Sequence, residues 1–418
     1  MFQTVRGMRD FLPEKMKVKQ FIEGTCRKAF EKYGFSPLQT PVVEEYATLS
    51  TKAGAGEEIK REIYYFKDQG ERELGLRFDL TVPLARVMAS NPELAKPFKR
   101  YQIGTVYRYD RPQAGRYREF TQADIDTVGT DSILADFECI AITAEIMQKL
   151  ELNFFIRINN RILLEDIAGL AGIPEKMIPE AFRSIDKLDK IDWQGVEKEL
   201  LEKKIDKKIL SFIKDNDLAD IEKMFKENKI ESKGLNELKQ LLELLKEQKL
   251  EKFIKIDLSL ARGLEYYTGN VFEVMAESQW TVCAGGRYDN LVKALGGRET
   301  PAVGISFGVD RLTDILFEKK ETESIAKIYL IPVNKELALN ALSIAQKIRE
   351  LEINVEMDLT GKGISKNLTY ASKKKIPFTV IIGEDELKNN EIKLKNMKTG
   401  KESAVKLNEL SKLKELIV

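Results

Sequence analysis

Two segments of the chain space their apolar residues as amphipathic helices do. Between residues 17 and 33, apolar side chains recur every three or four positions, and Gly34 ends the pattern. A second pattern of this kind runs from about Ser132 to Leu150. Both segments therefore predict helices with one apolar face, long enough to cover part of a sheet.

Segments with strand character make up much of the first 160 residues and return after residue 250. They are rich in β-branched and aromatic residues or alternate apolar with polar ones, and lie at 73–78, 98–109, 120–128, 154–159, 253–260, 271–275 and 302–307. Few helical crossovers separate these segments, which favours a mostly antiparallel sheet. We therefore predict an α+β domain in which helices flank such a sheet.

The pattern changes character twice along the chain. From about 163 to 250, charged helical sequence prevails with hardly a strand signal, which predicts a helical insertion or a solvated helical spacer. From about 324 onward, strands and helices alternate, which predicts a compact α/β domain with a mainly parallel sheet. We therefore divide the chain into 1–162 and 251–323 as two parts of one domain, 163–250 as the insertion, and 324–418 as a separate domain.

Composition narrows the chemistry available to these domains. Among 418 residues there is no histidine, and the three cysteines are far apart in the sequence. Histidine-based triads, histidine bases and histidine metal ligands are thereby excluded, and three thiols without histidine do not make the usual four-ligand zinc site. A required metal should be a hard cation such as Mg²⁺, held by carboxylates and substrate phosphates.

Charge and hydropathy limit which partners the protein can have and where in the cell it can act. The formal net charge is only +1, so binding of a nucleic acid would need local basic patches. There is no apolar run of membrane-spanning length and no signal-peptide pattern at the start. We expect a soluble protein of the cytoplasm that does not enter a membrane.

A predicted hairpin at 98–128 carries an unusual density of arginine. Six basic residues and one acidic residue lie between 99 and 118, and a loop with proline and glycine joins the two strands. Because the guanidinium group offers a planar fork of donors, this hairpin suits a polyphosphate. An exposed basic hairpin without a ligand is the alternative, but two further arginine-bearing segments argue against it.

The first of these segments, 260–272, places Arg262, Gly263, Tyr266 and Tyr267 after a predicted strand. A cation that can approach closely, beside two phenols, predicts a binding pocket for a small polar aromatic ligand next to an anion. The second, 301–312, runs from a strand of small residues into a helix whose first turn presents Arg311. The start of a helix already favours anions, and an arginine there strengthens the effect.

Together these stretches resemble the three signature motifs of class II aminoacyl-tRNA synthetases. The helix that ends before Pro41 resembles the first, 108–120 the second and 304–311 the third. The run Arg-Gly-Leu-Glu-Tyr-Tyr at 262–267 and the run Cys-Ala-Gly-Gly-Arg-Tyr-Asp at 283–289 are similar to the two histidine-specific signatures of histidyl-tRNA synthetases. This resemblance covers nearly the whole chain, and it implies a C-terminal anticodon-binding domain and a homodimer.

The resemblance also implies roles for individual residues. ATP would be held by Arg108 at the α-phosphate, Arg116 at the γ-phosphate, Phe120 stacked on adenine and Arg311 over its other face. Arg262 would lie at the α-phosphate and the substrate carboxylate, and with Arg108 it would be catalytic. Six residues would bind L-histidine with Arg262: Asp79, Thr81 and Gln122 at its amino group, and Asp126, Tyr266 and Tyr267 at its imidazole.

The implied activity is formation of histidyl-adenylate from L-histidine and ATP with Mg²⁺, followed by transfer of histidine to tRNA(His). Two positions depart from the family pattern, since Asp110 and Asp310 stand where relatives carry glutamate. Two non-catalytic alternatives exist within the resemblance. One is the regulatory subunit of ATP phosphoribosyltransferase, and the other is a synthetase-like sensor of uncharged tRNA. The intact arginines at 108, 262 and 311 argue against both.

Overall fold

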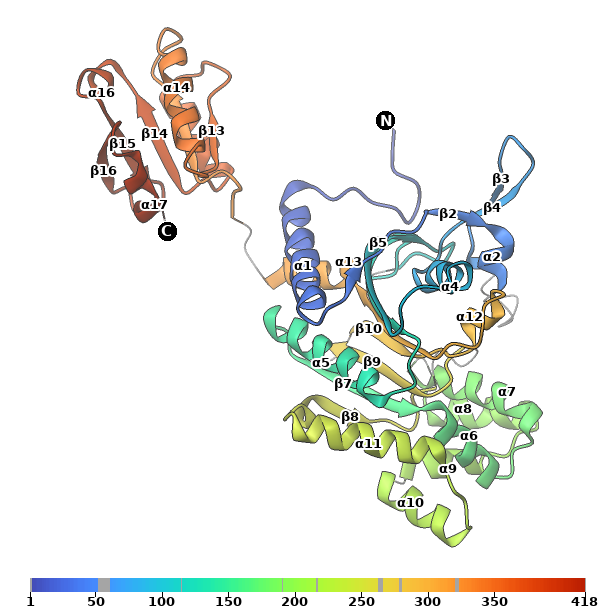
Figure 1. Cartoon of the computed structure of the whole chain (residues 1–418). Coiled ribbons are helices and arrows are strands. Elements are labelled where there is room, and N and C mark those ends of the chain that lie inside the picture. The colour runs from blue at the N-terminus through green and yellow to red at the C-terminus, as the bar shows by residue number, and fades with distance from the viewer. Residues whose placement is uncertain are drawn as a thin grey trace. The chain divides into compact units, whose positions relative to one another are not determined.

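The computed structural model describes residues 2–51, 61–113, 115–189, 191–215, 217–261, 266–277, 280–319 and 323–417. The chain divides into two compact units, residues 1–320 and 321–418 (Figure 1). Each unit has its own hydrophobic core and is described by itself.

The first unit is built on an eight-stranded sheet with the order β1-β5-β6-β11-β10-β9-β7-β8. The strands are β1 (Ser36–Pro37), β5 (Phe98–Tyr107), β6 (Glu119–Val128), β7 (Phe154–Asn160), β8 (Ile254–Ile256), β9 (Asn270–Ala276), β10 (Trp280–Arg287) and β11 (Ala302–Gly308). Only the pairs β1–β5 and β7–β8 are parallel. The predicted class, a mostly antiparallel sheet flanked by helices, is confirmed.

Three helices pack on one face of this sheet, and they are α1 (Pro13–Lys32), α5 (Ile133–Lys149) and α13 (Val309–Lys319). Pro13 begins α1, where a missing N–H costs no hydrogen bond, and the Ser132 hydroxyl caps α5 by accepting from the N–H of Leu134. In β6 the residues Ala123 and Ile125 join the core beneath these helices. Because side chains alternate along a strand, the residues between them point to the opposite face.

Smaller elements adjoin the sheet. A second sheet has the order β2-β4-β3, with β2 (Val43–Glu45), β3 (Tyr65–Lys67) and β4 (Glu73–Leu76). Three helices complete this region: α2 (Tyr46–Thr51), α4 (Thr81–Ser90) and α12 (Leu291–Ala294). The helix α4 packs on α2 and α12, so the segment that leads into α4 is held in place from two sides.

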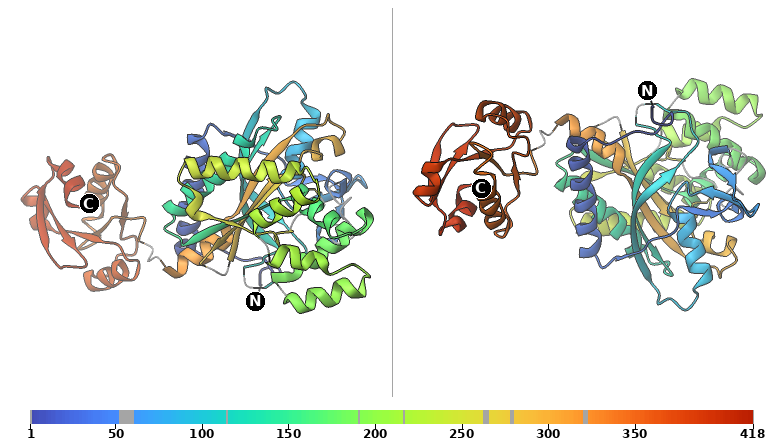
Figure 2. Two further views of the ribbon diagram at one scale, coloured as in Figure 1. Left: turned by 90° about the horizontal axis from the view of Figure 1, so that it is seen from below. Right: turned by 90° about the horizontal axis from the view of Figure 1, so that it is seen from above.

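A group of helices lies between β7 and β8 in the sequence and stays together in every view (Figure 2). It comprises α6 (Arg161–Leu170), η2 (Glu175–Met177), α7 (Ile178–Ile185), η3 (Asp186–Asp189), α8 (Trp193–Glu202), α9 (Lys208–Asp215), α10 (Leu218–Glu227), α11 (Lys233–Glu247) and η4 (Glu251–Phe253). The apolar face of α11, with Leu238 and Leu241, belongs to the same core as the sheet. This group is therefore packed onto the first unit.

The second unit holds a five-stranded sheet with the order β13-β12-β14-β15-β16. Its elements are β12 (Ile328–Pro332), α14 (Ala338–Arg349), β13 (Val355–Met357), α15 (Ile364–Lys373), β14 (Phe378–Ile382), α16 (Glu384–Lys388), β15 (Glu391–Asn396), β16 (Glu402–Lys406), η5 (Leu410–Lys412) and α17 (Leu413–Leu416). The first three strands are parallel, as predicted, whereas β15 and β16 form an antiparallel hairpin that we did not predict.

Across the described residues, no helix is both long enough and apolar enough to span a membrane.

Candidate active site

The centre of the site is the face of β6 turned away from the helices. We call Gln122, Asp124 and Asp126 the polar face of β6. In the antiparallel pairing with β11, these three residues lie opposite Gly308, Ser306 and Gly304, in that order. All three are buried, at 8%, 2% and 2% exposure. Small residues on β11 thus lie opposite a row of buried polar side chains.

Two glycines make this crowding possible. A Cβ added at Gly304 would collide with the carboxylate of Asp126. Gly286 lies opposite Gly304 in β10, and a Cβ there would meet the backbone oxygen of Asn270 at 2.6 Å and the ring of Tyr267 at 3.0 Å. Both glycines therefore permit close approaches that no other residue would allow.

Asp126, which sequence reasoning assigned to the imidazole, is held by two protein groups. Nη2 of Arg100 lies 2.6 Å from its Oδ2, and the Tyr288 hydroxyl donates a hydrogen bond to its Oδ1. Arg100 has no exposed surface and also donates to the backbone oxygen of Leu80 at 3.0 Å. The two buried charges depend on each other, because either one would be costly to bury without its partner.

Tyr266 and Tyr267 lie close to this carboxylate. Their ring centroids are 4.3 Å apart, and the centroid of Tyr266 is 6.4 Å from that of Tyr288. Burial raises the pKa of Tyr266, so its hydroxyl keeps its proton at neutral pH and can donate a hydrogen bond. Arg262, the cation predicted at the reacting phosphate, lies outside the described residues.

Asp79, Thr81 and Gln122 were predicted at the amino group of the substrate. Thr81 is the first residue of α4, and Oδ1 of Asp79 accepts from the N–H of Val82 at 3.0 Å. Gln122 donates from Nε2 to Oγ of Ser306 at 2.6 Å, and its Oε1 has no hydrogen-bond partner among the described residues. Burial raises the pKa of Asp124, and the negative charge of Asp79 adds to this rise, so the Asp79 carboxylate lies near the polar face of β6.

The predicted ATP residues cluster at the other end of the hairpin. Nε of Arg108 donates to the backbone oxygen of Phe78 at 3.0 Å, and its guanidinium carbon lies 5.2 Å from the ring centroid of Phe120. Arg116 is 44% exposed and forms an ion pair with Asp110 in the hairpin loop. An aromatic ring beside these cations suits an adenine ring with an attached polyphosphate.

Arg311 connects three elements of the site. From the first turns of α13, its Nε donates to the backbone oxygen of Gly115 at 2.7 Å and its Nη1 to that of Thr281 at 2.6 Å. The guanidinium therefore lies between the hairpin loop and β10. Arg108 and Arg116 thus belong to the β5–β6 hairpin and its loop, and Arg311 contacts that loop at Gly115.

Asp310, one of the two departures from the family pattern, is engaged in a charged cluster with the N-terminal segment. Its carboxylate lies 3.2 Å from Nη2 of Arg9 and 3.1 Å from Nζ of Lys19, and it accepts from the N–H of Thr121 at 3.1 Å. Arg9 also stacks on Tyr117, with its guanidinium carbon 3.5 Å from the ring centroid. Asp310 thus anchors the hairpin and the N-terminal segment to α13.

Sequence reasoning missed several residues of this site. Tyr288 stands inside the histidine-specific run at 283–289, so a signal was present, but its hydroxyl could not be placed without the fold. Arg100 was counted only among the hairpin cations, although its register opposite Asp126 makes it the counter-ion of that residue. Asp124 was not considered at all, since the resemblance gave it no role.

The comparisons with known proteins point to one family. Residues 7–312 match the family described as histidyl-tRNA synthetase, and residues 327–415 match an anticodon binding domain. The histidine–tRNA ligase 1 of Bacillus cereus is 40% identical, over 98% of this chain and 99% of the relative. A crystal structure of histidyl-tRNA synthetase from Nostoc covers 100% of this chain and 99% of that one, with 32% identity and a TM-score of 0.87.

The regulatory alternative finds less support. A structure described as an ATP phosphoribosyltransferase regulatory subunit/histidyl-tRNA synthetase from Bacillus halodurans is 26% identical, with a TM-score of 0.74, and covers 89% of this chain and 96% of that one. Its identity and TM-score are both lower than those of the Nostoc enzyme. The family match spans most of the chain, and the full-length relative is 40% identical. The chain belongs to the histidyl-tRNA synthetase family.

Proposed function

We propose that the chain activates L-histidine with ATP, releasing pyrophosphate, and transfers histidine from the adenylate to the 3′ end of tRNA(His). Membership of the family makes it an ATP-dependent histidine–tRNA ligase. The observation that supports this mechanism is one continuous hairpin with Arg108 and Arg116 towards its loop and Asp126, held by Arg100 and Tyr288, towards its other end.

We assign the nucleotide to the loop end of the hairpin. Arg108 would hold the α-phosphate, Phe120 the adenine ring, Arg116 the γ-phosphate and Arg311 the outer face of the adenine. The stack of Arg108 over Phe120 and the two carbonyl contacts of Arg311 support this placement. Adenylate formation needs little proton transfer, because the carboxylate of histidine is already ionised at neutral pH. Catalysis then rests on positioning and on cations around the phosphorus.

We assign histidine to the other end of the hairpin. Asp79, Thr81 and Gln122 would hold its amino group, and Asp126, Tyr266 and Tyr267 its imidazole. The fixed Asp126 carboxylate and the protonated Tyr266 hydroxyl offer an acceptor and a donor, as the two ring nitrogens require. The role of Arg262 at the α-phosphate and the substrate carboxylate rests on the resemblance alone.

Mg²⁺ belongs to this proposal as a companion of ATP. Among the described residues, no group of three carboxylate or thiol side chains could hold a metal ion. The two carboxylates nearest the nucleotide motifs, Asp110 and Asp310, pair with protein cations. The residues present therefore do not fit a resident metal centre, and Mg²⁺ would instead bind chiefly to the phosphates of ATP. We derive no catalytic step through it.

The second unit is proposed to recognise the anticodon of tRNA(His). Its match to an anticodon binding domain and its separate core support a module that acts apart from the catalytic sheet. We expect a chain that ends at residue 320 to lose most charging of tRNA(His) while it keeps most histidine-dependent exchange of pyrophosphate into ATP. Charging and exchange rates measured on the same preparation test this expectation, and a parallel loss of both would contradict it.

The homodimer and the cytoplasmic location implied by the family stay predictions. Exposed apolar side chains on α1 and in the segment that follows it, namely Phe21, Val42 and Val43, support an interface there. Sedimentation at micromolar concentration would test the dimer. Charging of tRNA(His) with radiolabelled histidine tests the proposed function as a whole, and it should require ATP and both substrates.

A further inference from the structure

Among the residues that the structure describes, the buried charges around the polar face of β6 do not balance. Three carboxyls lie there, Asp79, Asp124 and Asp126, with exposures of 5%, 2% and 2%. Two buried cations accompany them, Arg77 and Arg100. Arg77 donates to the backbone oxygens of Thr105 and Thr40 at 2.9 and 2.8 Å, and the Arg100 guanidinium pairs with Asp126. With all five of these described groups ionised, together they carry one excess negative charge.

Asp124 is the carboxyl at which this excess is least compensated. No ion pair to Asp124 occurs among the described residues, and its Oδ1 has no hydrogen-bond partner there. Burial raises its pKa to about 7; Arg100 and a hydrogen bond from Ser306 act against this rise, and the charges of Asp126 and Asp79 add to it. An isolated buried carboxylate is costly, so a ligand that supplies a cation would be bound strongly there.

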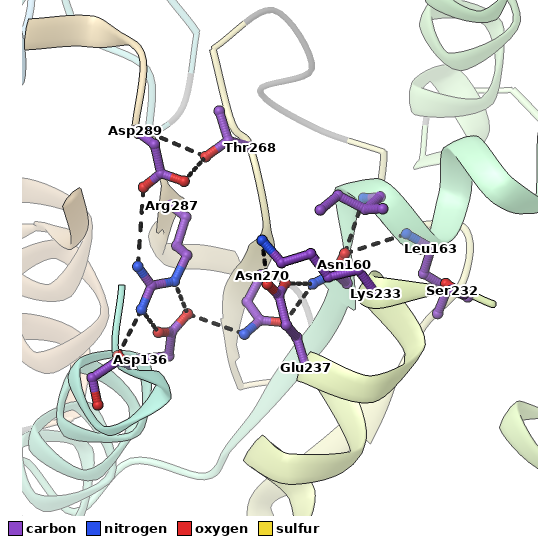
Figure 3. A network of polar contacts seen from close by, with 12 residues as sticks. Asp136, Asn160, Leu163, Ser232, Lys233, Glu237, Thr268, Asn270, Arg287 and Asp289 are labelled. Carbon is purple, nitrogen blue, oxygen red and sulfur yellow. Dashed lines mark hydrogen bonds and ion pairs between the residues drawn. The ribbon is translucent and has the colours of Figure 1, made fainter. Parts of the chain in front are cut away.

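A second buried aspartate in the same unit has its negative charge fully paired with groups of the protein. Asp136 of α5 accepts from Nδ2 of Asn270 at 3.0 Å and from Nε of Arg287 at 3.2 Å, and its other oxygen pairs with Nη2 of Arg287 (Figure 3). Asn270 in turn accepts from Asn160, at the start of α6. Every partner of Asp136 in this network comes from the protein, whereas Asp124 lacks such a set.

We propose that Asp124 is a further histidine-binding residue, which receives the α-ammonium group of the substrate. The inference rests on the proposed function and adds a residue to it. Asp124 lies between Gln122, assigned to the amino group, and Asp126, assigned to the imidazole. Asp126 is already neutralised by Arg100, and Asp79 accepts from the N-terminal turn of α4. The ammonium is the one full cation of histidine at neutral pH, and Asp124 forms no ion pair among the described residues.

The first test replaces Asp124 by asparagine, which keeps the shape and removes the charge. The KM for histidine in pyrophosphate exchange should rise about 10- to 100-fold, the weight of one charge-assisted hydrogen bond. A histidine analogue that carries a hydroxyl in place of the α-amino group should inhibit the variant and the wild type about equally, because this analogue has no ammonium group. An unchanged KM for histidine would overturn the inference, and so would an equal loss of affinity for both ligands.

The thermal stability of the ligand-free protein shows whether Asp124 binds the substrate or instead stabilises the fold. The variant Asp124→Asn should melt at or above the temperature of the wild type, because a poorly compensated buried carboxylate is removed. The matched control Asp136→Asn should melt lower, because Arg287 loses its nearest buried counter-charge. A fall in Tm for Asp124→Asn as large as that for the control would contradict the inference. Asp124→Ser serves as a second variant should the asparagine variant aggregate.

The pH dependence of these melting temperatures has a defined sign. The folded protein holds Asp124 with a pKa raised to about 7, whereas the unfolded chain has a pKa near 4. The contribution of Asp124 to the free energy of unfolding is therefore complete below about pH 4 and is lost as the pH rises through 7, where the buried carboxyl must ionise. The difference in Tm between Asp124→Asn and the wild type, in favour of the variant, should therefore grow between pH 5 and pH 8. Among the described residues, the charged and titratable groups that act electrostatically on Asp124 include Arg77, Arg100, Asp79, Asp126 and Tyr266, with Cys283 on the helix side of the sheet, and all are retained in the variant.

A difference in Tm that stays constant across this range would overturn the inference.

Failure of the proposed function would give a different result. If the wild-type protein showed no histidine-dependent exchange, the function itself would be wrong. If the wild type is active and Asp124→Asn matches it in the KM for histidine, only the role of Asp124 is wrong.

Discussion

Replacement of Arg108 by alanine is expected to reduce histidine-dependent pyrophosphate exchange by about 10³-fold, the range seen when a preorganised cation at a transferred phosphoryl group is removed. The guanidinium is fixed by the Phe78 carbonyl at 3.0 Å and lies over Phe120, so it would meet the α-phosphate without reorganising. The loss should appear in kcat, because the charge that Arg108 stabilises develops in the transition state.

A matched control is available in the same hairpin. Arg111 is exposed and has no assigned role, so Arg111→Ala should retain exchange within a few-fold of the wild type. Steady-state exchange with both variants, at saturating ATP and histidine, gives the comparison. An equal fall in the exchange rate for both variants would show that exchange depends on the total positive charge of the hairpin and not on the position of Arg108.

The second large effect is expected from Gly304→Ala. A Cβ at this position would collide with the Asp126 carboxylate and push it away from Arg100 and Tyr288. Because displacement of a positioning group by about 1 Å can cost on the order of 10² in rate, we expect a loss of at least this size in kcat/KM for histidine. Stability should also fall, since the buried ion pair with Arg100 is disturbed.

Gly24 provides the control for this substitution. It lies within α1, and a Cβ added there has no neighbour within 4 Å. Gly24→Ala should leave exchange unchanged and stabilise the protein by up to about 1 kcal/mol, because alanine loses less backbone entropy in a helix. Full activity of Gly304→Ala would show that Asp126 does not need its observed position.

Much of the catalytic fold could be predicted because its patterns are local. The Arg-rich hairpin became β5 and β6, and the apolar spacing after Ser132 became α5 with that serine as its cap. The strand β10 was missed because its Ala-Gly-Gly stretch has none of the bulk of a typical strand. Those small residues make sense only with the fold in hand, since Gly286 faces Asn270 and Tyr267.

Contacts between distant segments could not be predicted from local patterns. Arg9 and Asp310 are separated by about 300 residues and meet only because α1 packs on α13. The pairing of Arg100 with Asp126 depends on the register of the hairpin, which the loop sequence did not specify. The resemblance supplied roles for residues that match the family motifs, and it was silent about Asp124, which stands between two of them.

The central claim is that this site activates histidine, and exchange of radiolabelled pyrophosphate into ATP measures that step directly. We predict exchange that requires L-histidine and is not supported by glutamine or tyrosine, since neither side chain presents two ring nitrogens to Asp126 and the tyrosine hydroxyls. A folded protein that shows no exchange with histidine, or equal exchange with the other two amino acids, would contradict the account.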